Sequence, residues 1–179
     1  MSTMKCNTSL VNVMILLSFL FVASYADENN CVFTFYVKTG SIIKAGTDSK
    51  INLELWNKYG DGVRITDIEK WGGLMGPNYD YFERSNLDVF SGRGPCLSGP
   101  ICAIKVVSDG SGPHHGWYLD FVEVTTTGPH KGCAQQKFEV YQWLASDTSP
   151  YELTAERDYC PYDDLTKGRP SNLRAISSF

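Results

Sequence analysis

The sequence predicts an all-β domain, and three observations support this fold class. Short runs in which apolar and polar residues alternate recur along the chain, and this period of two is typical of strands with one buried face. Clusters of Gly, Pro, Asn and Asp separate the runs, and aromatic residues, which favour strands, make up 13% of the 179 residues. Seven or eight such runs in one domain-sized stretch indicate an antiparallel sandwich or barrel.

The expected strands follow one another through the middle of the chain. They cover residues 32–37, 51–56, 63–68, 87–90, 101–107, 117–125 and 138–144. The first shows the pattern most clearly, because Phe33, Phe35 and Val37 would share one face. Residues 59–62, with the sequence Tyr-Gly-Asp-Gly, predict a hairpin turn between two of these strands.

Residues 1–26 predict a secretory signal peptide. Lys5 precedes the apolar run 10–23, and Ser24-Tyr25-Ala26 then suits cleavage after Ala26. The alternative is an uncleaved membrane anchor, but the run is short for a spanning helix. No other segment is apolar enough to span a bilayer, so we expect a soluble mature chain in the secretory pathway. It would be secreted to the apoplast or lie in the endoplasmic reticulum.

The folded domain is expected at residues 27–160, with its core at about 31–145. The alternation fades after Ala145, and residues 161–179 mix Pro, Gly, Ser and charged residues, so we expect a flexible C-terminal tail. The chain ends in Ser178-Phe179 and not in a retention signal, which makes secretion the default. We expect a monomer.

Five cysteines follow the predicted leader, where an oxidising compartment favours disulfides. They are Cys31, Cys96, Cys102, Cys133 and Cys160. This odd number predicts two disulfides and one free thiol. We expect Cys31 to pair with Cys160, which would tie the ends of the domain together, and Cys96 to pair with Cys102 across a tight loop. Zinc is the alternative, but the paired C-x-x-C spacing of structural zinc sites is missing.

Charge and motif content argue against two function classes. The net charge is −4, and losing the leader with Lys5 makes it one unit more negative, so nucleic-acid binding is not expected. His114-His115 lie in a Gly-rich loop where Ser111 could complete a Ser/His/Asp arrangement, but the strand–elbow–helix context is missing. The free cysteine with a histidine is a second route to a nucleophile. We expect instead a polar loop that positions Trp117, and no enzyme.

Two loops carry the hard oxygen ligands that calcium prefers. They are residues 44–48 and 75–80, and neither has the EF-hand pattern. Ordinary turns capped by Asp and Asn side chains are the alternative. The second loop follows an apolar stretch, residues 71–75, which is a liability in water unless it is buried or contacts another surface.

Four segments together carry a recognisable order of motifs. They are FTFYVKTG at 33–40 with AGTDS at 45–49, FERSNLDVF at 82–90, HGWYLDFVEV at 115–124, and FEVYQWL at 138–144. This order resembles the PLAT (lipoxygenase-homology) domain family over about residues 32–145. With the leader, the cysteines and SPYELTA at 149–155, the chain resembles the small single-domain secretory plant members, a group linked to stress responses.

The resemblance implies an eight-stranded antiparallel β-sandwich made of two four-stranded sheets. It also implies an interaction module and not an enzyme, because in lipoxygenases and lipases this domain lies beside a separate catalytic domain. There it helps the enzyme to meet membranes or partner proteins. We therefore expect binding to membrane lipid surfaces, and the alternative is a protein–protein adaptor with neither lipid nor calcium binding.

Some PLAT domains bind calcium, and the resemblance implies which residues would do so here. By position they are Gly46, Thr47, Asp48, Gly76, Asn78 and Asp80. The chain departs from the family pattern at Lys44, where calcium-binding members often carry an acid. A cation there opposes a divalent ion and removes a ligand.

Calcium-dependent members place apolar side chains at loop tips beside the metal, which here implies lipid contact by Trp71, Leu74 and Met75. In the alternative, Trp71 packs into the sandwich edge while Leu74 and Met75 plug its end. Because the chain is negatively charged, binding to anionic lipid would need calcium or a purely apolar anchor.

Overall fold

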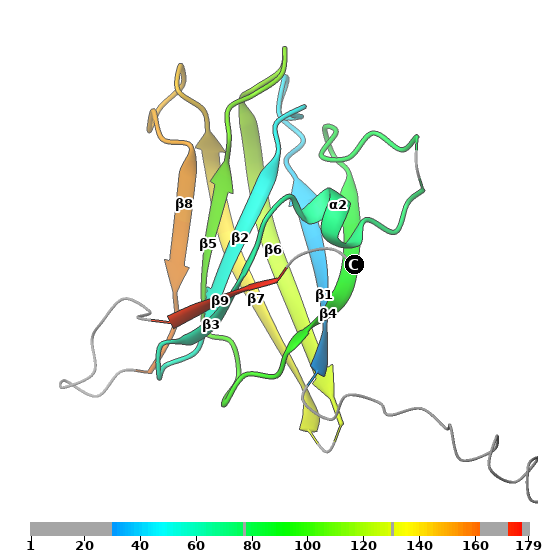
Figure 1. The fold of residues 1–179 in the computed structure, drawn as a ribbon. Helices are drawn as coiled ribbons and strands as arrows, with labels where there is room; N and C mark the ends of the chain where they lie inside the picture. Colours follow the sequence, from blue (N-terminus) through cyan, green and yellow to red (C-terminus); the bar gives the residue numbers. More distant parts are fainter. Residues whose placement is uncertain (1–29, 77, 130, 162–171, 177–179) are drawn as a thin grey trace, which may run out of the picture.

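Two β-sheets pack face to face, as the alternating pattern predicts (Figure 1). The computed structural model describes residues 30–76, 78–129, 131–161 and 172–176. The first sheet has the order β4-β1-β6-β7, which is Leu87–Pro95, Asn30–Thr39, Trp117–Gly128 and Lys131–Leu144. The second has the order β8-β5-β2-β3-β9, which is Thr154–Asp158, Ala103–Ser108, Ile51–Trp56, Asp61–Ile65 and Asn172–Ile176.

The core lies between the sheets and is built from every second residue of the strands. Phe33 and Phe35 of β1 are fully buried, and so are Leu53 and Leu55 of β2 in the other sheet. Burying a side chain of this size contributes about 1.5–3 kcal/mol. The period-two pattern therefore supplies most of the apolar contact that holds the layers together.

Two strands were not expected from the alternation, β8 and β9. The described part of the tail corrects the prediction of a flexible segment, because residues 172–176 form β9 and pair in parallel with β3. Ile176 is 6% exposed, and Arg174 makes an ion pair of 2.8 Å with Asp61. The predicted sandwich is confirmed, but its second sheet has five strands in place of four.

The disulfide pairing predicted from the sequence is wrong. The structure joins Cys31 to Cys96 and Cys102 to Cys160, and Cys133 is an exposed free thiol. Strand register explains both bonds. In the β1–β4 ladder Cys31 is opposite Gly94, two residues before Cys96, and in the β5–β8 ladder Ala103 is opposite Asp158, which brings the cysteines just beyond those strands together.

The expected leader, residues 1–26, lies outside the described residues. Within the part of the chain that the structure describes, no helix is both long and apolar enough to cross a membrane. Leader cleavage and compartment therefore stay predictions.

Candidate functional site

Three loops meet at one end of the sandwich, the upper end in Figure 1, which we call the loop end. They are residues 40–50, 73–86 and 109–116. Gly46 allows the first two loops to touch, because a Cβ there would lie 3.1 Å from the Arg84 backbone nitrogen and 3.2 Å from the Phe82 carbonyl oxygen. The Thr47 N–H also donates to the Phe82 carbonyl at 3.3 Å. The A-G-T-D turn is thereby fixed against residues 82–84.

This contact brings three carboxylates together. Oxygen atoms of Asp48, Asp80 and Glu83 all lie within 4.8 Å of one another, and the three residues are exposed. Sequence reasoning named Asp48 and Asp80 but missed Glu83, although it follows Asp80 by three residues in the same loop. Clustered carboxylate oxygens on loops are the donor set that calcium prefers, so these residues fit that ion.

The other expected calcium ligands are placed differently. Thr47 is buried, and its hydroxyl donates to the His114 carbonyl at 2.8 Å. Gly76 adopts φ 95°, and its carbonyl accepts from the Tyr79 N–H at 3.3 Å, which closes a turn. Asn78 is exposed on that turn. The backbone oxygens of Gly46, Thr47 and Gly76 and the side chain of Asn78 therefore stay predicted ligands, beside the three carboxylates that the structure groups together.

A buried carboxylate holds the second loop in place. Asp88 on β4 accepts from the Tyr79 hydroxyl at 3.0 Å and from the Phe82 N–H at 2.7 Å. Burial raises the pKa of Asp88, and those two hydrogen bonds offset part of that effect. Asp80 lies between these two fixed residues, so its position is set by a network that sequence reasoning did not detect.

The apolar part of the loop points to water. Leu74 is 59% exposed and Met75 is 45% exposed. The Met75 N–H donates to the Tyr81 hydroxyl at 2.7 Å, and the Tyr81 ring packs on Phe90 with centroids 5.0 Å apart. The exposed tip is therefore tied to the residue that follows Asp80.

The predicted lipid contact by Trp71, Leu74 and Met75 is wrong for Trp71, which is buried. It lies on α2 (Ile68–Gly72), a short helix that the sequence did not predict. Asp67 caps the start of this helix, because its side chain accepts a hydrogen bond from the Lys70 N–H. The indole is 7% exposed and meets Phe35 edge to face at 5.7 Å. Trp71 is thus part of the core, as the packing alternative held, while Leu74 and Met75 remain available for contact.

A second apolar pair lies on the neighbouring loop and was missed. Ile42 is 42% exposed and Ile43 is 78% exposed, and the Ala45 N–H donates to the Ile42 carbonyl at 3.2 Å. The signal was the adjacent isoleucines directly before Lys44 in a segment with no strand alternation. The two loops that carry the carboxylates therefore each bear an exposed apolar pair.

Each of the two adjacent histidines contacts a carboxylate. His114 Nδ1 lies 3.0 Å from Asp48 Oδ2, and His115 Nε2 lies 3.5 Å from Asp147 Oδ2. The Ser111 N–H donates to Asp109 at 2.9 Å, within the turn itself. Among the described residues, no hydrogen bond joins the Ser111 hydroxyl to either imidazole.

Comparison with known proteins agrees with the fold. Residues 33–157 match the PLAT/LH2 domain. The chain belongs to the PLAT/LH2 domain family. PLAT domain-containing proteins 2 and 1 of Arabidopsis thaliana are 59% and 60% identical over 140 residues, which is 78% of this chain and 76% and 77% of theirs.

A solved structure shares the fold. A coral 8R-lipoxygenase structure matches with a TM-score of 0.51 at 17% identity, and the match covers 78% of this chain and 18% of that one. At that identity the likeness concerns the fold alone. The PLAT match ends at residue 157, so β9 is an addition to the matched domain.

Proposed function

We propose that the protein is a non-enzymatic interaction module that binds membrane lipid surfaces through its loop end. The observation that carries the proposal is the exposure of Leu74 (59%) and Met75 (45%) on the loop that also bears Asp80 and Glu83. Large apolar side chains that stay exposed to water mark contact surfaces, and these two share a loop with two of the carboxylates.

The apolar tips supply affinity. Each side chain of this size that enters the bilayer interface contributes about 1.5–3 kcal/mol. Ile42 and Ile43 offer two more exposed apolar side chains on the neighbouring loop. Partial insertion of a few such residues gives reversible binding and not permanent anchoring.

Calcium at Asp48, Asp80 and Glu83 assists this contact. When bound, the ion would neutralise carboxylates that otherwise repel anionic lipid headgroups. The coral lipoxygenase structure is described as showing calcium activation via a C2-like domain, which supports the same use of a similar fold here. Asp48 lies 3.0 Å from the His114 imidazole. Among the described residues, Asp80 and Glu83 form no ion pair, so a cation would meet two carboxylates without a basic partner.

The compartment we propose is the plant secretory pathway, either the apoplast or the endoplasmic reticulum, in a stress-response role. The predicted leader and the two disulfides support an oxidising compartment. The similarity to Arabidopsis PLAT proteins supports a plant context.

Vesicle sedimentation tests the proposal. Purified protein is mixed with phosphatidylcholine vesicles, with calcium or with chelator, and the bound fraction is measured for the wild type and for the double variant Leu74→Ser, Met75→Ser. The wild type should sediment with vesicles, and the variant should lose roughly tenfold or more in affinity, since it loses two buried apolar groups.

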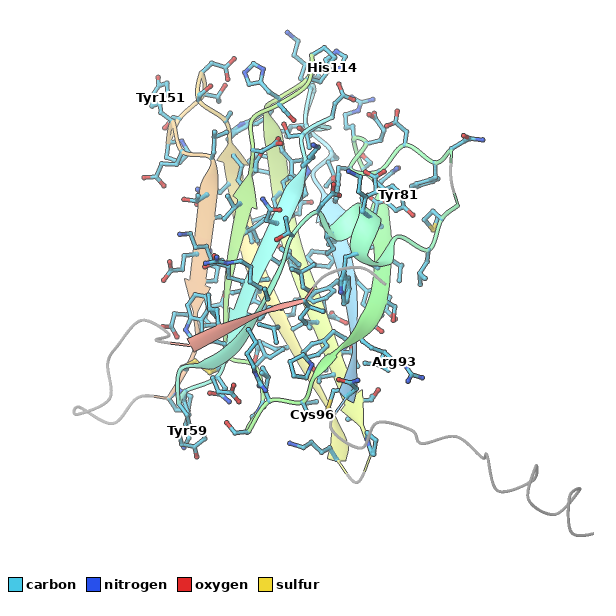
Figure 2. All side chains as sticks on the ribbon, in the orientation of Figure 1. Tyr59, Tyr81, Arg93, Cys96, His114 and Tyr151 are labelled. Carbon is cyan, nitrogen blue, oxygen red and sulfur yellow. A yellow bond between two sulfur atoms is a disulfide. The ribbon has the colours of Figure 1, made fainter. Side chains whose placement is uncertain are left out.

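Tyr59→Ser is the matched control, because Tyr59 is 67% exposed at the opposite end of the sandwich (Figure 2). It should leave binding unchanged. Wild type that stays in the supernatant under both conditions would contradict lipid binding and favour the protein–protein adaptor.

A further inference from the structure

A groove of about 640 Å³ opens beside the carboxylates at the loop end. Its lining includes Lys44, Arg84, His114 and His115, and Ile43 and Trp143 give it apolar walls. The nitrogen donors come from three separate loops that only the fold brings together. His114 marks its position at the top of the sandwich in Figure 2.

Among the described residues, the two permanent cations of the groove, Lys44 and Arg84, have no ion-pair or hydrogen-bond partner for their side chains. The nearby acids Asp48 and Asp147 are already in contact with the two histidines. Glu83 lines the groove and also belongs to the carboxylate cluster.

Both cations start from a fixed backbone. Lys44 has φ 65°, a conformation that lysine rarely adopts, and the hydrogen bond from the Ala45 N–H to the Ile42 carbonyl closes the turn around it. The Arg84 backbone lies against Gly46. A short loop held this closely orders the bases of both side chains before any ligand arrives.

We propose that this groove binds a phosphate group between Lys44 and Arg84. A guanidinium presents a planar fork of donors and an ammonium a compact charge, and both are suited to phosphate oxygens. The exposed Ile43 at the rim and the Trp143 wall suit the glycerol and acyl parts that follow the phosphate of a lipid. Lys44 thus has a role as a headgroup contact where the family pattern often has an acid.

The proposal rests on the proposed function only for the source of the phosphate. A membrane lipid and a small soluble phosphate present the same chemistry to the groove. A cation held by Glu83 and its neighbours would reduce the negative charge that this phosphate meets.

Vesicle binding provides the first arm of the test. Vesicles of phosphatidylcholine alone are compared with an equimolar mixture of phosphatidylcholine and phosphatidic acid. The wild type should bind the mixture more tightly, and the double variant Lys44→Ala, Arg84→Ala should lose roughly thirtyfold of that gain while it binds pure phosphatidylcholine as before. The control variant Lys58→Ala, Arg93→Ala removes the same charge from exposed positions outside the groove and should keep the gain.

A second arm uses inorganic phosphate and glycerol 3-phosphate, followed by NMR shifts of the backbone amides of His114 and His115, which line the groove and are unchanged in the variant. Shifts in the wild type that vanish in the Lys44→Ala, Arg84→Ala variant show a groove that takes a free phosphate, even where no vesicle binds. If the wild type binds phosphatidic acid vesicles more tightly but free phosphates cause no amide shifts, the phosphate that the groove binds is that of a lipid headgroup. The proposal is overturned if the double variant keeps the full gain, if the control loses as much, or if the wild type shows neither gain nor shifts.

Discussion

At the loop end, carboxylates, cations and apolar side chains face water on loops without a covalent tie, whereas at the opposite end two disulfides close the structure. Cys31–Cys96 and Cys102–Cys160 lie there, next to the ion pair between Arg174 and Asp61. Figure 2 shows Cys96 and Tyr59 at that lower end and His114 at the upper.

The difference between the two ends indicates that the disulfide end stabilises the fold and the loop end carries the binding groups. Cross-links at the lower end restrict the unfolded chain, so the upper end can present groups that do not favour folding, such as exposed Leu74 and Met75. Changes at the lower end should therefore alter the free energy of unfolding, and changes on the loop tips should alter only binding.

The largest effect on the free energy of unfolding is expected at Trp71, which is buried only three residues before the exposed Leu74. Trp71→Ala should lower the free energy of unfolding by about 3–5 kcal/mol, since it removes a large buried ring that packs on Phe35. Leu74→Ala, three residues away and exposed, should change it by no more than about 0.5 kcal/mol. Urea unfolding of the two variants measures both values, and equal costs would break the assignment of Trp71 to the core.

The double variant Cys31→Ser, Cys96→Ser should cost about 2–5 kcal/mol of stability. Cys133→Ser is the control and should cost almost nothing, because that thiol is free and exposed. Thermal unfolding under matched conditions reports the loss. If the disulfide variant lost calcium or vesicle binding while still folded, the two ends would not be separate in function.

Ile176→Ala tests whether the described part of the tail belongs to the fold. Ile176 is 6% exposed, and a Cβ added at Gly94 would collide with its Cδ1 atom, so the side chain packs directly on β4. The expected cost is about 2 kcal/mol, at the low end for a buried isoleucine because β9 lies at an edge. A variant as stable as the wild type in urea would show that β9 does not dock in solution.

The smallest effect concerns pH. The folded-state pKa of Asp88 is raised above 3.8, mainly by burial, so its ionised form opposes folding at neutral pH. That opposition is removed as the pH falls through the raised pKa of the folded state toward the ordinary pKa of an Asp carboxyl. The stability of the wild type relative to Asp88→Asn should therefore increase on acidification. Urea midpoints of both proteins at several pH values test this, and a difference that is constant or falls would contradict it.

Much of the fold could be predicted, because the strands of the core bury every second residue. What failed depends on long-range register. The disulfide partners follow from the pairing of Cys31 with Gly94 across β1 and β4, which no local pattern reveals. The tail has few apolar residues. Ile176 is buried because it packs at Gly94, which is far away in the sequence.

The candidate site was predicted in part. Asp48 and Asp80 could be named from the family motif, but Glu83 joins them only through the close approach at Gly46. The direction of Trp71 depends on a single helical turn after Asp67, too short to give a periodic signal. Apolar content alone cannot distinguish that inward ring from the outward Leu74.

Calorimetric titration of calcium, with and without phosphatidylcholine–phosphatidic acid vesicles, tests most directly whether the loop end is one cation-dependent contact surface. The wild type should bind calcium with a dissociation constant of about 10⁻⁴–10⁻³ M, as extracellular modules do, and more tightly with vesicles. Asp80→Asn should lose this binding, and Glu156→Gln, an exposed acid on β8, should keep it. Wild type that takes up no calcium under either condition, or Asp80→Asn that titrates like the wild type, would contradict the account.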